Sequence, residues 1–118
     1  MANTLLPVEF DFVIPQGATF RIEFQYNDED GDPIDISGYS GQAKLRHKSK
    51  NGAEAFLFAT TNARMTLTAL GVIALHATAT ETASIAEGRY GYDIELINGA
   101  TVYRVVEGFV DVTREATR

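Results

Sequence analysis

The side chains best suited to chemistry form an acidic turn in the first third of the chain. Its alternating carboxylates are Asp28, Asp30, Asp32 and Asp35. Clustered oxygen ligands suit a calcium ion, and the EF-hand loop is the pattern to test. That pattern fails, because Gly31 and Pro33 interrupt the ligand spacing and Tyr39 stands at the twelfth position, where glutamate is required. We therefore predict a strand connection in which aspartates cap nearby backbone amides.

A cationic segment follows the acidic turn and contains all three lysines of the chain. Either the two segments are solvated charges that discourage stray strand pairing, or they are complementary patches on neighbouring subunits. In the second interpretation the interface also includes apolar residues at the N-terminus of the chain. The candidate interface then consists of Leu5, Leu6, Pro7, Val8, Asp28, Asp30, Asp32, Lys44, Arg46, Lys48 and Lys50.

The sequence contains no recognisable catalytic grouping. Cysteine is absent, and His47 and His76 stand outside any nucleophile or zinc-site motif. No phosphate-binding loop, dinucleotide fingerprint or His-Glu-x-x-His motif occurs. We therefore expect a protein that is not an enzyme and that uses no cofactor, metal or small-molecule substrate.

Length and charge narrow the class further. The 118 residues suit one domain with its own core. A net charge of −6 argues against a general nucleic-acid binder, because phosphate binding needs clustered lysine and arginine. The first residues lack the pattern of a signal peptide, and no run approaches the roughly 20 apolar residues of a membrane span. We expect an arm at residues 1–7, a domain at residues 8–118, and neither nucleic acid nor membrane as partner.

Hydrophobic periodicity predicts an all-β domain. Phe20, Ile22, Phe24 and Tyr26, for example, share one face of a strand whose other face is polar. The predicted strands span residues 8–14, 19–26, 42–47, 54–60, 65–68, 72–77, 89–97 and 101–113. Seven or eight such strands indicate an immunoglobulin-like sandwich of two antiparallel sheets, with a small barrel as the main alternative.

Turn residues predict how these strands are connected. Thr78 and Glu81 form a capping-box pattern, so residues 79–86 are expected to contain one or two helical turns. The pairs Asn51-Gly52 and Asn98-Gly99 predict type I′ hairpins. Gly108 lies within the last strand and predicts a bulge or a close backbone approach, with a switch of the inward face at that point.

Several of these motifs occur in an order shared with a known family. They are Gln16-Gly17-Ala18-Thr19-Phe20, Asp30-Gly31-Asp32-Pro33-Ile34-Asp35-Ile36-Ser37-Gly38-Tyr39, Gly71-Val72-Ile73-Ala74-Leu75, Glu81-Thr82, Gly88-Arg89-Tyr90-Gly91-Tyr92-Asp93-Ile94-Glu95 and Gly108-Phe109-Val110-Asp111-Val112-Thr113. From about Ile14 onward the chain resembles small immunoglobulin-like β-sandwich proteins of tailed bacteriophages, and is similar to the N-terminal domain of baseplate upper proteins. The resemblance implies a virion component, made in the host cytoplasm, that packs against other virion proteins and copies of itself in the tail, baseplate, neck or capsid surface.

Tyrosines suggest an alternative function. Tyr39, Tyr90, Tyr92 and Tyr103 are candidates for an aromatic platform that binds sugars. Tyr90 and Tyr92 share a strand face with Ile94 and Leu96, so we predict that these two belong to the core. The remaining tyrosines and the loop acids are the basis for the alternative, a module that binds host-surface carbohydrate.

Overall fold

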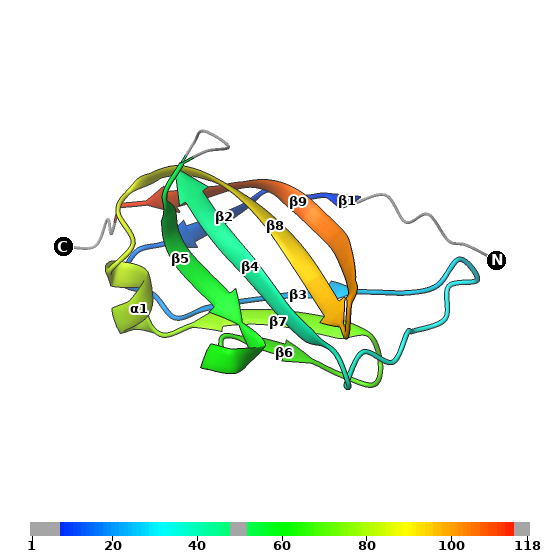
Figure 1. The fold of residues 1–118 in the computed structure, drawn as a ribbon. Coiled ribbons are helices and arrows are strands. Elements are labelled where there is room, and N and C mark those ends of the chain that lie inside the picture. Colours follow the sequence, from blue (N-terminus) through cyan, green and yellow to red (C-terminus); the bar gives the residue numbers. More distant parts are fainter. Residues whose placement is uncertain (1–7, 48–51, 115–118) are drawn as a thin grey trace.

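The computed structural model describes residues 8–47 and 52–114, which form two packed β-sheets (Figure 1). Sheet A contains β1 (Val8–Glu9), β2 (Phe12–Pro15), β4 (Ser40–His47), β5 (Glu54–Ala59), β8 (Gly88–Asn98) and β9 (Thr101–Thr113). Sheet B contains β3 (Phe20–Gln25), β6 (Met65–Leu67) and β7 (Val72–Ala77). The strand order is β1-β9-β8-β4-β5 in sheet A, with β2 also paired to β9, and β3-β7-β6 in sheet B.

This strand order is that of an immunoglobulin-like sandwich, as predicted. The neighbours β9, β8 and β4 correspond to strands G, F and C of that fold, and they oppose β3, β7 and β6, which correspond to B, E and D. A tyrosine corner is also present, because the Tyr90 hydroxyl near the start of β8 donates to the Ala86 carbonyl at 2.6 Å. The described residues contain nine strands instead of seven or eight, because the first predicted strand is divided.

The core lies between the inner faces of the two sheets. Alternate residues of the long strands point inward, and the fully buried ones include Ile14, Leu45, Phe58, Leu75 and Ile94. Tyr90 and Tyr92 are buried with them, as predicted. Each such side chain contributes roughly 1.5–3 kcal/mol by leaving water.

The N-terminal segment differs from the prediction of an antiparallel strand over residues 8–14. It forms two short strands, β1 and β2, and both run parallel to β9. Val8 pairs with Val106 and Phe12 pairs with Val110, so the register is the same on either side of the break. The break is therefore a local change in hydrogen bonding at Phe10 and Asp11, without an inserted residue.

Two side chains, those of Asp11 and Tyr92, close this break. In a continuous parallel ladder the Phe109 amide would donate to the Phe10 carbonyl. Instead it donates to the Asp11 carboxylate at 2.9 Å, and the Tyr92 hydroxyl donates to the Phe10 carbonyl. Burial raises the pKa of the Tyr92 phenol, which therefore stays protonated as a donor.

Gly108 makes this arrangement possible. The Phe10 carbonyl lies so close to Gly108 that a Cβ atom at position 108 would overlap it. The predicted close backbone approach is therefore confirmed. The inward face, however, does not switch at this glycine.

The switch of inward face occurs at Val105. Ile94 pairs with Val106 while Glu95 pairs with Arg104, so Val105 is the extra residue of a bulge. Val105 and Val106 are consequently both buried. The bulge lies nearer the hairpin than the glycine suggested.

The hairpin between β8 and β9 is present, but its turn residues differ from the prediction. Asn98 pairs with Thr101, so the two-residue loop is Gly99-Ala100 and not Asn98-Gly99. Only Gly99 has a positive φ, of 63°, which corresponds to a type II′ turn and not to type I′. The other predicted hairpin pair, Asn51-Gly52, begins outside the described residues.

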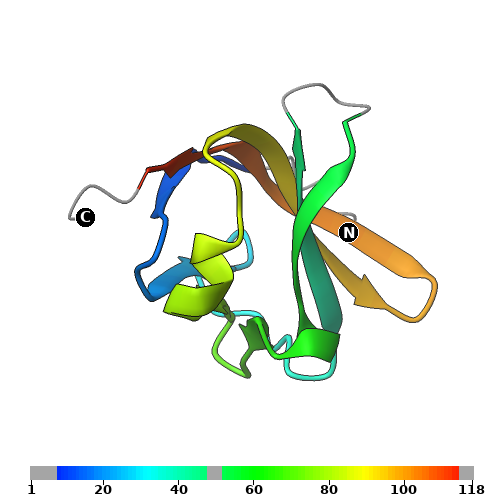
Figure 2. The same cartoon turned by 90° about the vertical axis from the view of Figure 1, so that its left-hand side faces the viewer.

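The short helix α1 (Ala79–Ala83) closes one end of the sandwich between the two sheets (Figure 2). Its predicted capping box is confirmed: the Glu81 amide donates to Thr78 Oγ1 at 3.1 Å, and the Thr78 amide donates to Glu81 Oε1 at 2.8 Å. The hydroxyl of the fully buried Thr82 donates to the Ala18 carbonyl in the β2–β3 turn at 2.9 Å. Within the part of the chain that the structure describes, no helix is long and apolar enough to cross a membrane.

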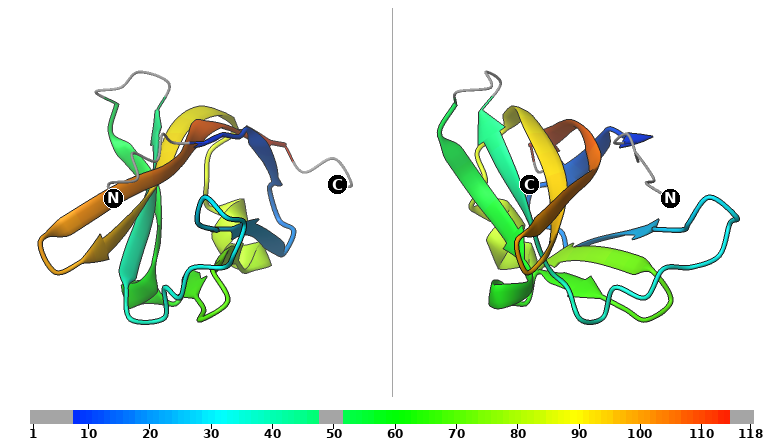
Figure 3. Two further views of the ribbon diagram at one scale, coloured as in Figure 1. Left: turned by 90° about the vertical axis from the view of Figure 1, so that its right-hand side faces the viewer. Right: turned by 45° about the vertical axis from the view of Figure 1, so that its right-hand side comes forward.

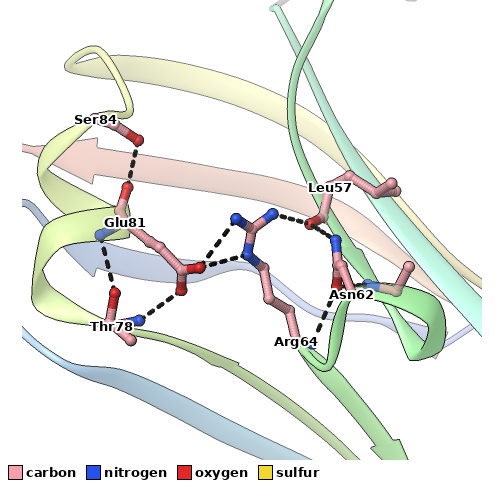
Figure 4. Close-up of polar contacts among 7 residues, drawn as sticks. Leu57, Asn62, Arg64, Thr78, Glu81 and Ser84 are labelled. Atoms are coloured by element: carbon pink, nitrogen blue, oxygen red, sulfur yellow. Dashed lines mark hydrogen bonds and ion pairs between the residues drawn. The ribbon is translucent and has the colours of Figure 1, made fainter.

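An arginine connects this helix to sheet A (Figure 4). Arg64 follows the 3-10 helix η1 (Thr60–Asn62) and forms an ion pair with Glu81 at 3.0 Å. Its guanidinium also donates to the Leu57 carbonyl of β5 at 3.0 Å. The hydrogen bond from the Thr78 amide is the main cause that lowers the pKa of Glu81, and Arg64 lowers it further.

Replacing Gly108 with alanine should destabilise the protein by about 2 kcal/mol, because the added methyl group overlaps the Phe10 carbonyl. The matched control is Gly91→Ala on the neighbouring strand, where a Cβ atom meets open space. Its effect should be less than about 1 kcal/mol. Denaturant unfolding measures both changes, and equal losses for the two variants would contradict the close approach.

Glu81 should make folding pH-dependent. Its pKa is lower in the folded than in the unfolded chain, so its contribution is complete above the ordinary value near 4.5 and is lost as the pH falls through the folded value. Glu81→Gln keeps a capping-box acceptor but cannot titrate. The free energy of unfolding should therefore fall less between neutral and acidic pH in this variant than in the wild type. Identical pH profiles would show that Glu81 does not make this contribution.

Candidate protein interface

Lys44 and Arg46, the two cationic residues of the predicted interface that the structure describes, lie on the outer face of sheet A, which faces the viewer in Figure 1. On β4, Ala43 and Leu45 are buried, so Lys44 and Arg46 point away from the core. A shallow groove of about 970 Å³ runs over this face from β4 across β8 and β9 to Glu9 on β1. The groove brings together strands from both ends of the chain.

Charge is unevenly distributed across the groove. Lys44 and Arg46 lie on the β4 side. On the other side Glu107 of β9 pairs with Asp93 of β8 and with Glu9 of β1, so three carboxylates are adjacent. Such a group of like charges on neighbouring strands is destabilising unless cations lie near it. The positions of these residues give the groove a cationic side at β4 and an acidic side at β9 and β1.

The arginines of β8 and β9 already have partners on this face. Arg104 forms ion pairs with Asp93 at 3.1 Å and with Glu95 at 3.5 Å. Arg89 pairs with Asp111 at 3.0 Å, and this carboxylate raises the pKa of Arg89. The Arg89 guanidinium also lies over the exposed Phe109 ring, 4.8 Å from its centroid.

Five charged groups that line the groove form no ion pair among the described residues, and one of them, Asp11, instead accepts a hydrogen bond from the Phe109 amide. Within residues 8–47 and 52–114, no ion pair is formed by Lys44, Arg46, Glu9 or Glu107. The two cations lie on β4, whereas the two carboxylates lie on β9 and β1, on the far side of β8. The surplus charges of this face are therefore separated by sign.

The acidic turn is a strand connection beyond the end of β3 (Figure 1). The Asp28 carboxylate accepts hydrogen bonds from the amides of Asp30 and Asp32 at 2.9 and 3.0 Å, so it caps local amides as predicted. Ser37 donates to Asp35, mainly through its hydroxyl, and lowers the pKa of that carboxyl. Among the described residues, no group of three or more potential ligand side chains is arranged to hold a metal ion.

The structure does not bring the acidic turn to the cationic strand. Asp28, Asp30 and Asp32 do not line the groove that contains Lys44 and Arg46. The acids that share this face come instead from β1, β8 and β9, and the sequence pattern did not reveal them as a group. The remaining predicted interface residues, Leu5, Leu6, Pro7, Lys48 and Lys50, lie outside the described residues.

The free edge of β3 is a second surface feature. Among the described residues, β3 pairs with β7 alone. Because the Tyr26 amide bonds to the Gly71 carbonyl, the alternating pattern directs the peptide groups of Arg21, Glu23 and Gln25 away from the sheet. Beside this edge, Phe10 is 43% exposed. Phe10 contacts Phe24 of β3, with ring centroids 5.4 Å apart. An edge with no partner among the described residues therefore borders an exposed aromatic ring.

The opposite edge of the sandwich, at β5, is protected. Asn62 donates to the Leu57 carbonyl at 3.0 Å and accepts from the Ala59 amide at 3.1 Å. Arg64 binds the Leu57 carbonyl and, through its own amide, the Ala59 carbonyl. Side chains and loop backbone thus occupy much of the β5 edge, which prevents another strand from pairing there.

Tyr26, Tyr39 and Tyr103 form a tyrosine cluster. Tyr103 lies on β9 near the β8–β9 hairpin, which turns away from β3 in Figures 2 and 3. The rings of Tyr39 and Tyr103 lie 6.4 Å apart, and Tyr103 is 39% exposed. Burial raises the pKa of the nearby Tyr26, and the two other phenols add to this effect. The two histidines are not part of this cluster, because His47 lies on β4 of sheet A and His76 on β7 of sheet B.

Comparisons with known proteins add information on the fold alone. No protein-family model and no curated protein sequence matches the chain. Among solved structures, the chain is similar to the filamin domain of Lin-41, with a TM-score of 0.48 and 17% sequence identity. The similarity covers 88% of this chain and 84% of that chain.

Proposed function

We propose that this protein is a non-enzymatic structural component of a tailed-phage virion that acts by packing against other virion proteins and against copies of itself. The virion context comes from the resemblance of the motifs between Gln16 and Thr113. The observation that supports an assembly role is the edge of β3, which has no partner among the described residues and lies beside the exposed Phe10 ring.

The β3 edge and the β5 edge differ in how far they are covered, and this difference supports the assembly role. Free strand edges pair readily with other chains, and proteins that stay monomeric usually cover them. Here the β5 edge is covered by Asn62 and Arg64, whereas the outward peptide groups of β3 have no described partner. An extended segment from a neighbouring subunit would complete sheet B at this edge and cover Phe10.

Blocking the β3 edge should weaken assembly. Glu23→Pro removes an outward N–H without breaking a bond to β7, and proline is tolerated at such edge positions. Association, followed by light scattering after size exclusion and by binding to the products of adjacent genes, should weaken by roughly tenfold. The control Glu23→Ala also loses the exposed ion pair with Arg21 but keeps the N–H, so it should assemble normally. A wild-type chain that stays monomeric and binds none of these proteins would contradict the proposal.

The tyrosine cluster favours one alternative, a module that binds host-surface carbohydrate. Tyr39 and Tyr103 lie close enough to offer neighbouring ring surfaces to a sugar. In that case a glycan array should give a signal that Tyr39→Ala abolishes, and repeating it with a chelator tests any role of calcium. A uniformly blank array would contradict this alternative.

A further inference from the structure

We infer that a second copy of this chain packs on the outer face of sheet A, related to the first by a twofold axis that runs along the strands. The inference goes beyond the proposed function because it names a further surface and its partner. It does not depend on the edge of β3, which belongs to the other sheet.

The separated surplus charges specify the partner. Lys44 and Arg46 require a surface that places carboxylates opposite them, and Glu9 and Glu107 require one that places cations opposite them. A second copy of the same face supplies both sets. A uniformly basic or acidic partner would satisfy one side of the groove and repel the other.

The charge pattern also selects the symmetry axis. In an isologous dimer the same patch occurs on both subunits, and the axis lies in the interface. An axis across the strands would place β4 against β4 and bring the cations of both copies together. An axis along the strands places β4 of one copy over β9 and β1 of the other, so Lys44 and Arg46 meet Glu9 and Glu107.

The shape of the face fits the same axis. Phe109 on β9 is opposite Gly91 on β8, so an exposed ring stands next to bare backbone. If the axis runs along the side of β8 that faces β9, β4 of each copy lies over β9 and β1 of the other. Phe109 of each copy then lies beside Gly91 of the other, where the space above Cα is open. Asp93, the acid between the two charged sides, is already paired with Arg104.

Two reciprocal charge reversals test the inference. The cation-reversed variant is Lys44→Glu with Arg46→Glu, and the acid-reversed variant is Glu9→Lys with Glu107→Lys. Each variant alone should associate at least roughly tenfold more weakly than the wild type, because like charges then face each other. A mixture of the two should form a heterodimer, because both sets of contacts regain opposite charges. Sedimentation velocity measures all three, after circular dichroism has verified each fold.

Controls separate this surface from other causes of association. Arg21→Glu with Arg114→Glu changes the net charge as much as the cation reversal does, but away from the groove, and should leave the dimer intact. Glu23→Pro should also leave it intact, so the two proposals fail independently. Wild-type association should weaken as the salt concentration is raised from roughly 0.02 M to 0.5 M, because salt screens the charges. A monomeric wild type at low salt, a dimer that ignores both reversals, or a mixture that stays monomeric would overturn the inference.

Discussion

The parallel pairing of the N-terminal segment with β9 is the constraint on which the surfaces of this protein depend. It requires the Phe10 carbonyl to approach Gly108 and requires Tyr92 and Asp11 to replace the missing ladder bond. Because residues 8–15 are thereby committed to sheet A, β3 has no described partner on its outer side. The same pairing places Glu9 next to Glu107. A free edge and an acidic patch therefore have one structural origin.

The two sheets consequently offer different kinds of contact. The β3 edge offers peptide groups with no described partner beside an exposed aromatic ring, which suits strand addition by an extended segment. The outer face of sheet A offers charges separated by sign, which suits a flat surface of complementary pattern and controls register. The β5 edge, covered by Asn62 and Arg64, offers neither. Assembly through the first two surfaces would leave that third side free.

Local sequence patterns predicted the features that depend on local physics. Alternation along residues 19–26 and 89–97 predicted the inward faces, and Thr78 with Glu81 predicted the helix cap. Period-two alternation carries no information on the direction of the neighbouring strand, so the parallel pairing of residues 8–15 was missed. The bulge at Val105 was missed because two adjacent valines, Val105 and Val106, leave the inward phase ambiguous. For the interface, the sequence identified Lys44 and Arg46 as members of a cationic segment, but Glu9 and Glu107, the acids across the groove, become adjacent only through that parallel pairing.

Amide hydrogen exchange along β3 tests this account most directly. In a solution dilute enough to keep the chain monomeric, the amides of Ile22 and Phe24 should be protected by their bonds to β7, whereas those of Arg21, Glu23 and Gln25 should exchange rapidly. This alternating pattern would show that the edge is free and that the N-terminal segment pairs elsewhere. Uniform protection from Arg21 to Gln25 would contradict the account, because it would mean that another strand of the same chain occupies this edge.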